Sequence, residues 1–561
     1  MSPRPPARRV RGLFAVLVMG LAAIGTRVSM LQLRDAEEYV ALARSQRIRE
    51  IDVPASRGSI LDRSGHEMAI SLAAKAVFAN PRMIERPLQV AERLAPVLGV
   101  PAKQLARALR EDTGFVYLAR RVDVEAAAEI EAMGIEGIDF LEESKRHYPA
   151  GDLAPQVMGF VGVDGAGLSG IELQYDEVLG GRAGKMLIEQ DPAGRPIPTG
   201  LSRIREPVPG EDLVLTIDRD LEFQAQRALQ AAVKANGALG GTVVVLDPRS
   251  GDVLAMVSYP WFDANDFATA PPDVIRNRAV TDMHEPGSVN KVITAAAALE
   301  SGAIGLHETF EVPDSYQVGD KLFRDVHPHP PAQMTIGDII AQSSNVGTIM
   351  VAERLGRDRL ASFLTRFGYG RETGIDFPGE AEGILMPRDE WWVTSMGTIP
   401  MGQGIAVTPL QMASVYATLA NDGVRVRPRL VRGVRDAGGE IHEEPVRRGR
   451  RVISGETAAT LREMLVRVVE EGTGKLAAVP GYRIGGKTGT ARKPLEDALG
   501  YSDQYIASFI GFAPADDPRI VVAAMLDEPE TVYGGVAAAP LFREVARYAL
   551  ADLHVPPTEG P

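Results

Sequence analysis

A serine and a lysine lie one helical turn apart in the sequence Glu-Pro-Gly-Ser-Val-Asn-Lys, which ends at Lys291. Pro286 and Gly287 predict a turn, and the residues that follow, up to Gly302, predict a helix with Ser288 at its N-terminus. A serine hydroxyl becomes a nucleophile when a base takes its proton, and a neutral lysine amine is such a base. The helix dipole and burial in a dry cleft would both favour the neutral amine. Taken alone, however, the pair is more typical of a capping serine beside a surface lysine.

Two further motifs follow in what we predict to be the same domain. The first, Gln-Ser-Ser-Asn-Val-Gly at 342–347, contains Ser343 and Asn345, a hydroxyl and an amide that can pass protons and hold a substrate amide. The second, Gly-Lys-Thr-Gly-Thr at 486–490, lies in a stretch that can form a strand. An edge strand of this composition supplies positive charge and hydroxyl groups for a carboxylate, and its glycine lets a substrate backbone approach closely. With these companions, the catalytic interpretation of Ser288 and Lys291 outweighs the capping one.

The composition excludes several classes of site. The chain has 561 residues, enough for two or three domains, and its 45% hydrophobic and 24% charged residues are typical of a globular protein. A net charge of −13 disfavours nucleic acid as a partner. The absence of cysteine excludes disulfides, thiol catalysis and zinc–thiolate sites, and it suits an oxidising compartment. His327 and His329 indicate a proline-rich surface loop, so we predict neither a metal site nor a cofactor.

The N-terminal residues predict a membrane anchor. Residues 12–33 are apolar apart from a short interruption at Thr26 and Arg27, and they can span a bilayer if Arg27 snorkels at the far interface. Arginines in residues 1–11 predict a cytoplasmic tail and an exported remainder. A cleaved signal peptide is the alternative, although no clean Ala-x-Ala site follows the apolar run.

Residues 36–205 are predicted to form an α+β unit. Its helical patterns cover 36–47, 87–98, 102–111 and 124–133, and turn residues separate strand-like pieces around 54–65. Arg57, Asp62 and Arg63 are interpreted as a buried ion-pair cluster that braces this unit rather than as catalytic groups.

Residues 210–555 are predicted to form a mixed α/β domain, followed by a frayed tail at 556–561. Residues 242–247 and 252–258 predict a β-hairpin, 504–511 and 519–526 predict strands, and 540–550 predict a closing helix. Because strands from both ends enclose a helix-rich middle, we expect the site to lie between sheet and helices.

The three motifs together are the signature of penicillin-binding proteins and class A β-lactamases. Beyond the signature, the sequence resembles class B penicillin-binding proteins over nearly all its length. The similarity includes Arg-Gly-Ser-Ile-Leu-Asp-Arg-Ser-Gly at 57–65, and further stretches at 27–32, 147–152, 159–162, 401–405 and 408–411. Tyr-Gly-Gly-Val-Ala-Ala-Ala-Pro-Leu-Phe at 533–542 is similar to the division-specific, FtsI-type branch rather than to the elongation branch.

This resemblance implies a multidomain α+β fold. A single transmembrane helix would precede an elongated pedestal domain of the penicillin-binding protein dimerisation type. A β-lactamase-like transpeptidase domain, with an antiparallel sheet flanked by helices, would follow. The implied activity is that of a peptidoglycan D,D-transpeptidase in septal wall synthesis. Ser288 would attack the penultimate D-Ala of a stem peptide, release the last D-Ala, and pass the acyl group to an amine of a neighbouring stem.

The resemblance also assigns roles to the motif residues. Lys291 would be the base, Ser343 would relay a proton to the leaving amine, and Asn345 would hold the donor amide and the Lys291 side chain. Lys487, Thr488, Gly489 and Thr490 would bind the substrate and its terminal carboxylate. The N–H groups of Ser288 and Thr490 would form the oxyanion hole. β-Lactams would acylate the same serine, and the resulting acyl-enzyme would be released slowly.

The chain departs from the family at Val289-Asn290, where Thr and an apolar residue are usual, and at His284, where an aromatic residue is usual. The N-terminal unit does not resemble a glycosyltransferase. The family therefore implies a polytopic SEDS glycosyltransferase partner of the FtsW type, other divisome proteins, lipid-linked nascent glycan and a place in the inner membrane, with the catalytic domain periplasmic.

Three alternatives stay open. A membrane-anchored D,D-carboxypeptidase or β-lactamase would use water in place of the amine, although neither needs a long pedestal. A non-enzymatic divisome scaffold or β-lactam sensor would keep the fold for binding. An elongation-type class B transpeptidase is the nearest variant.

Overall fold

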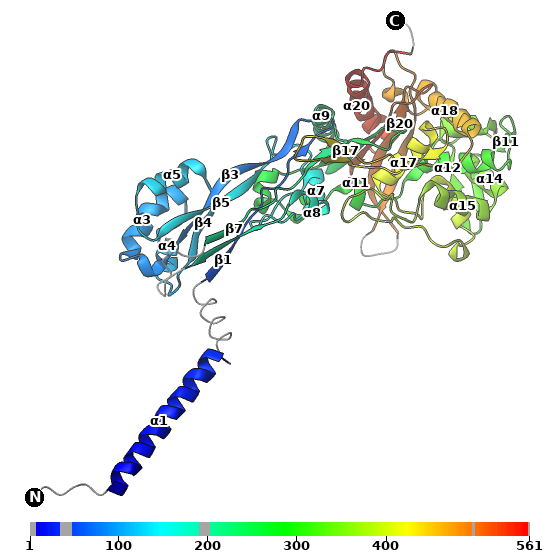
Figure 1. Cartoon of the computed structure of the whole chain (residues 1–561). Helices are drawn as coiled ribbons and strands as arrows, with labels where there is room; N and C mark the ends of the chain where they lie inside the picture. Colours follow the sequence, from blue (N-terminus) through cyan, green and yellow to red (C-terminus); the bar gives the residue numbers. More distant parts are fainter. Residues whose placement is uncertain (1–6, 34–47, 190–201, 496–499, 559–561) are drawn as a thin grey trace, which may run out of the picture. The chain divides into compact units, whose positions relative to one another are not determined.

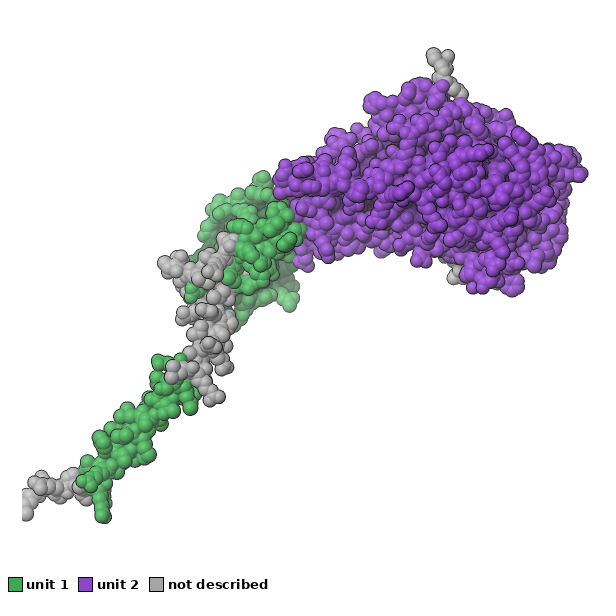
Figure 2. Space-filling view, turned by 45° about the vertical axis from the view of Figure 1, so that its right-hand side comes forward, with its two compact units in different colours: residues 1–56, 72–145, 181–209 green, residues 57–71, 146–180, 210–561 purple. Residues whose placement is uncertain are grey.

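The computed structural model describes residues 7–33, 48–189, 202–495 and 500–558. By its contacts the chain divides into two compact units (Figure 2). Unit 1 comprises residues 1–56, 72–145 and 181–209, and unit 2 comprises 57–71, 146–180 and 210–561. Segments 57–71 and 146–180, which the sequence places in the pedestal, thus belong by contacts to unit 2. The helix predicted at 36–47 lies outside the described residues.

Helix α1 (Ala7–Leu33) contains the predicted anchor. The most apolar 18-residue window of its stretch Arg8–Gln32 has a mean hydropathy of 1.9, and none of that window is buried in the described chain. At about 1.5 Å per residue the whole stretch is longer than the roughly 30 Å hydrocarbon core of a bilayer. The Thr26 hydroxyl donates to the carbonyl of Ala22 at 2.8 Å, so this polar group is satisfied within the helix. The helix fits a single-pass membrane anchor.

Unit 1 contains a small sheet and a helical layer. Strands β1 (Ile48–Val53), β6 (Gly184–Glu189) and β7 (Ser202–Arg205) pair antiparallel in the order β1-β6-β7. Helix α3 (Pro87–Leu98) has the predicted bounds, because Pro87 fits its first turn and left-handed Gly99 ends it. The remaining elements are α4 (Ala102–Ala108), α5 (Val124–Ala132), β4 (Val116–Asp123) and parts of β3 (Glu67–Ala79) and β5 (Ile138–His147). Apolar side chains such as Val77, Leu94 and Ile130 form their common core.

Unit 2 is built on a five-stranded antiparallel sheet in the order β10-β9-β21-β20-β19. Figure 1 labels its strand β20. The strands are β9 (Gly240–Leu246), β10 (Val253–Tyr259), β19 (Gly485–Pro494), β20 (Tyr501–Ala513) and β21 (Ile520–Asp527). The predicted hairpin and both predicted C-terminal strands are thus confirmed. The central strands are buried on both faces, as expected of a sheet covered by helices on each side.

Two helical layers cover this sheet. On one face α9 (Arg219–Ala235) and α20 (Ala539–Asp552), the predicted closing helix, share a core with it. On the other face lie α12 (Lys291–Glu300), α13 (Ile336–Gln342), α14 (Asn345–Leu355), α15 (Arg357–Phe367), α17 (Pro409–Ala420) and α18 (Gly455–Glu470). Helix α12 is central: it packs against α14, α15 and α18, and its alanines are fully buried. β19 is one of the two edge strands and lies against the residues that precede α12.

Shorter elements complete unit 2. β2 (Ile60–Leu61) pairs parallel with β8 (Asp212–Leu215), which pairs with β16 (Val431–Arg435) and, beyond it, β17 (Ile441–Glu443). The others are α6 (Pro155–Met158), α7 (Gly170–Gln174), α8 (Asp176–Leu179), α10 (Pro272–Ile275), α11 (Arg278–Thr281), β11 (Thr309–Val312), β12 (Ser315–Val318), β13 (Lys321–Arg324), β14 (Ala332–Thr335), β15 (Val424–Arg425), β18 (Arg450–Arg451), α16 (Ser395–Thr398) and α19 (Gly534–Ala537).

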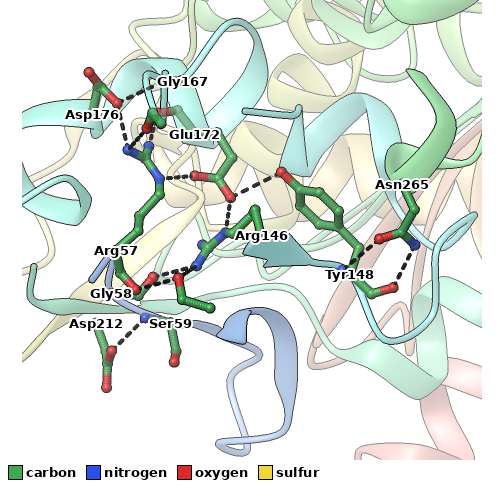
Figure 3. A network of polar contacts seen from close by, with 12 residues as sticks. Arg57, Gly58, Ser59, Arg146, Tyr148, Gly167, Glu172, Asp176, Asp212 and Asn265 are labelled. Atoms are coloured by element: carbon green, nitrogen blue, oxygen red, sulfur yellow. Dashed lines mark hydrogen bonds and ion pairs between the residues drawn. The ribbon is translucent and has the colours of Figure 1, made fainter. Parts of the chain in front are cut away.

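A buried ion-pair network surrounds Glu172 in unit 2 (Figure 3). The Glu172 carboxylate, with no exposed surface, accepts from Arg57 Nε and Arg146 Nε, each at 2.6 Å. Arg57 also reaches Asp176 at 2.6 Å. The predicted cluster is therefore right about Arg57 but wrong about its partners. Asp62 instead accepts backbone N–H groups of its own turn, including that of Ser64 at 2.8 Å, because a short Asp side chain readily bonds its local backbone.

Candidate active site

Ser288 lies on a tight turn that leads into the central helix. The turn is the 3-10 helix η3 (Gly287–Asn290), so the α-helix begins at Lys291 and Ser288 is not at its N-terminus as predicted. The Gly287 N–H donates to the Gly402 carbonyl at 3.0 Å, which fixes the entry to the turn. Gly287 has φ +60°, and a Cβ there would lie 2.9 Å from the Thr490 carbonyl oxygen. Glycine is therefore required for the turn to lie this close to β19.

Lys291 is fully buried and directed at the second motif. Its Nζ donates to the Ser343 carbonyl at 2.6 Å and to Asn345 Oδ1 at 2.7 Å, and it lies 3.3 Å from Ser343 Oγ. Burial lowers the pKa of Lys291 to about 7, while the negative charge of Asp325 acts in the opposite direction. Because neutral and charged forms coexist near neutral pH, this amine can both take and return a proton.

The Ser343–Asn345 segment joins two helices by a sharp reversal. Ser343 ends α13 in the left-handed conformation, at φ +60°, which is uncommon for a residue other than glycine. Ser344 caps α14 by accepting from the Gly347 N–H at 2.8 Å. Asn345 Nδ2 donates to the Arg324 carbonyl at 3.0 Å. The reversal brings both the Ser343 hydroxyl and the Asn345 amide within reach of Lys291.

The third motif lies on β19 and supplies a second buried lysine. Lys487 Nζ donates to Ser343 Oγ at 2.9 Å, and it lies 3.4 Å from Thr488 Oγ1. Burial lowers the pKa of Lys487 well below its usual value, and the positive charge of Lys291 lowers it further. The Ser343 hydroxyl therefore lies between two lysine nitrogens.

A cleft of about 910 Å³ opens beside these groups, and neither Lys291 nor Lys487 lines it. Ser288, Ser343, Asn345, Thr488 and Thr490 all line it, the two threonines because alternate residues of a strand share a face. Gly489 faces the other way. A Cβ on Gly489 would lie 2.3 Å from Ser508 Oγ and 3.0 Å from a methyl group of Val289, so this glycine allows contact with η3 rather than with a substrate backbone.

Comparisons with known proteins identify the family. Residues 241–547 match the penicillin-binding protein transpeptidase domain, and residues 52–215 match the penicillin-binding protein dimerisation domain. The chain is 38% identical to penicillin-binding protein PbpB of Mycolicibacterium smegmatis, over 99% of this chain and 91% of that one. It is 32% identical to peptidoglycan D,D-transpeptidase FtsI of Escherichia coli, over 96% and 91% of the two chains. It belongs to the class B penicillin-binding proteins of the FtsI type.

The fold agrees with this assignment. Penicillin-binding protein 3 of Mycobacterium tuberculosis, whose crystal structure contains aztreonam, superposes with a TM-score of 0.72 at 34% identity, covering 91% of this chain and 98% of that one. The FtsI-type fold, an N-terminal apolar helix with a dimerisation and a transpeptidase domain, is thus the one that the sequence predicted.

Two polar residues of this class B site were missed by sequence analysis. Asp325 lies at the N-terminus of α14, where its carboxylate accepts from Ser344 Oγ at 2.6 Å and from the Val346 N–H at 2.9 Å. Thr473 places its hydroxyl 2.8 Å from that of Thr488. Neither residue stands at a fixed spacing from a motif, so only the fold brings them to the cleft.

The histidine loop is closer to the site than expected. His327 and His329, predicted on a surface loop, both line the cleft. His329 contacts the Pro330 carbonyl at 2.8 Å and Asp325 Oδ2 at 3.1 Å, and these contacts raise its pKa. Among the described residues, the potential metal ligands that cluster are Asp436, Glu440 and His442, on the β16–β17 turn.

The departures from the family pattern support the nucleophile turn. Asn290 is buried and donates to the Ile399 carbonyl at 2.9 Å, which ties η3 to the segment before Gly402. His284 is buried and kept neutral, because burial lowers its pKa to about 4. Its backbone N–H donates to the Val407 carbonyl at 3.0 Å, a bond that does not depend on the side chain. Asn290 thus acts on the position of the turn through its side chain, and neither residue lines the cleft.

Proposed function

We propose that this protein is a peptidoglycan D,D-transpeptidase that crosslinks stem peptides through a Ser288 acyl-enzyme during septal wall synthesis, and that β-lactams inactivate it. The observation that carries the proposal is the Ser343 hydroxyl held between two buried lysines beside Ser288, in a cleft open to a ligand. Relatives named peptidoglycan D,D-transpeptidases, and a related penicillin-binding protein crystallised with aztreonam, support the substrate class and the inhibitors.

Acylation begins with proton transfer from Ser288 to the neutral amine of Lys291. The serine oxygen forms a bond to the carbonyl carbon of the penultimate D-Ala, and the N–H groups of Ser288 and Thr490 stabilise the negative oxygen. The C–N bond to the last D-Ala then breaks, and Ser343 donates a proton to the leaving amine. Ser343 recovers a proton from the lysines that contact its hydroxyl.

The remaining motif residues orient the donor peptide. Thr488 and Thr490, which line the cleft, bind the terminal carboxylate as two hydroxyl donors, and buried Lys487 supports Thr488 from behind. Asn345 donates one amide N–H to Arg324, which leaves the other for the carbonyl oxygen of the donor amide. Attack by an amine of a neighbouring stem then forms the crosslink and frees Ser288.

We place the protein in the inner membrane, with α1 as the anchor, its N-terminus in the cytoplasm and its catalytic domain in the periplasm. Residues 36–205 and 210–555 are proposed as the pedestal and transpeptidase domains, which the two matched family segments support. Glycan polymerisation is assigned to a SEDS glycosyltransferase partner of the FtsW type within the divisome.

Intact-mass spectrometry after incubation with benzylpenicillin tests the proposal. We expect one stable adduct on the wild type and none on Ser288→Ala. An adduct on Ser288→Ala would contradict the assignment of the nucleophile. Rapid hydrolysis of the drug would favour a β-lactamase, whereas an unmodified protein with intact drug would favour a scaffold.

A further inference from the structure

Thr473 is held in the cleft by close backbone contacts. It follows α18, in the sequence Gly-Thr-Gly at 472–474, and it lines the same cleft as Ser288. A Cβ on Gly472 would lie 2.4 Å from the Ala341 carbonyl oxygen, and one on Gly535 would lie 2.3 Å from that of Thr473 itself. Thr473 is thus fixed between the end of α13 and the start of α19.

The Thr473 hydroxyl faces that of Thr488. Their oxygens are 2.8 Å apart, and either can be the donor. Lys487 Nζ lies 3.4 Å from the same Thr488 oxygen and can only donate to it when charged. A hydroxyl has one proton and two lone pairs, so the Thr488 proton points either at Thr473 or into the cleft.

A carboxylate in the cleft decides between the two directions. An ionised carboxylate only accepts hydrogen bonds, so it requires the Thr488 proton to point towards it. The Thr488 oxygen then accepts from Thr473 and Lys487, and a hydroxyl that accepts hydrogen bonds is a stronger donor. Without the Thr473 hydroxyl, one lone pair of Thr488 loses its donor.

We propose that Thr473 is a positioning residue that directs the Thr488 hydroxyl at the terminal carboxylate of the substrate. This inference rests on the proposed function, because it takes the carboxylate of the donor peptide as the group that Thr488 binds. Thr473 acts on recognition of that charge, and bond formation at Ser288 does not depend on it.

The test compares Thr473→Val, which keeps the shape and removes the hydroxyl, with Thr473→Ser, which keeps the hydroxyl. The probes are benzylpenicillin and its methyl ester, which lacks the negative charge. For benzylpenicillin we expect Thr473→Val to lower the second-order rate constant of acylation about tenfold, the size of one hydrogen bond that supports a charged acceptor. Thr473→Ser should stay within about twofold of the wild type.

With the ester, Thr473→Val and the wild type should react at the same rate. Saturation kinetics give a second readout: the loss should fall on the dissociation constant of the drug, with the acylation rate constant at saturation within about twofold. Equal losses with both probes, or a loss in the saturating rate constant, would show a merely structural role. Wild-type rates for Thr473→Val would also overturn the proposal.

Intact mass gives the active fraction of each variant, so rates refer to folded protein. Failure of the proposed function is separate, because it would appear in the wild type as an adduct that does not require Ser288.

Discussion

Two clusters of buried charge in unit 2 are built in opposite ways. Around Glu172, the arginines Arg57 and Arg146 meet carboxylates at 2.6 Å, so each charge has a partner of opposite sign. Behind the cleft, Lys291 and Lys487 are as deeply buried, but their contacts are hydroxyl, amide and carbonyl oxygens. Paired ions keep their charges and brace the fold, whereas buried lysines without such a partner give up their protons more easily. The Glu172 cluster is therefore suited to stabilising the fold, and the lysine cluster to proton transfer.

Removing one member of the lysine cluster should have the largest effect. Lys291→Met should lower the second-order rate constant of benzylpenicillin acylation by about a thousandfold, because it removes the general base. The control is Lys475→Met, at a lysine that lines the cleft in front of the buried cluster. That variant should stay within about threefold of the wild type, since it alters only the field around the cleft. Near-normal acylation of Lys291→Met would transfer the role of base to another group.

Removing one member of the paired cluster should affect stability and spare the chemistry. Arg57→Met should lower the free energy of unfolding of unit 2 by about 3–5 kcal/mol, because it leaves Glu172 buried with one partner fewer. A urea titration measures this free energy, with the loss of benzylpenicillin acylation as the signal of unfolding.

The control is Arg388→Met, which breaks an ion pair with Asp358 whose side chains are 53% and 77% exposed. This variant should lower the free energy of unfolding by about 0–1 kcal/mol. An equal loss in the free energy of unfolding for the two variants would contradict a structural role of the Glu172 cluster. Slower acylation by folded Arg57→Met would contradict its separation from the chemistry.

The change of the acylation rate constant with pH near neutrality should be the smallest of these effects. Burial lowers the pKa of Lys291 to about 7, and the neutral amine is the active form in the proposed mechanism. The rate constant should therefore rise with pH through about 7 and level off above it, by about tenfold per unit on the acid side. A profile that is flat across this range would rule out Lys291 as the titrating base.

Asp325→Asn sharpens the same measurement. The Asp325 charge raises the pKa of Lys291, so its removal should move the midpoint of the profile to lower pH. A midpoint at higher pH would show that the variant acts through the cap of α14 instead.

Sequence analysis succeeded where the information is local. The bounds of α3 follow from Pro87 and Gly99, and the three short motifs contain part of the cleft lining, including Ser288, Ser343 and Thr488. It failed where a contact between residues far apart in the sequence sets the local structure or the ion-pair partner. The turn at Ser288 is set by Gly402, and Arg57 pairs with Glu172, two segments that no periodicity links. Asp325 and Thr473 are likewise ordinary loop residues until the fold brings them to the motifs.

The position of β19 at the edge of the sheet has a consequence for solubility. An edge strand carries unpaired backbone groups and is a template for association with another copy of the same strand. Residues at the far end of β19 counter this hazard: Arg492 adds an exposed positive charge, and Pro494 cannot donate a ladder hydrogen bond, whereas the charge of Lys493 is paired with Asp527 and Glu528. Two copies of the chain would therefore pair poorly along this strand.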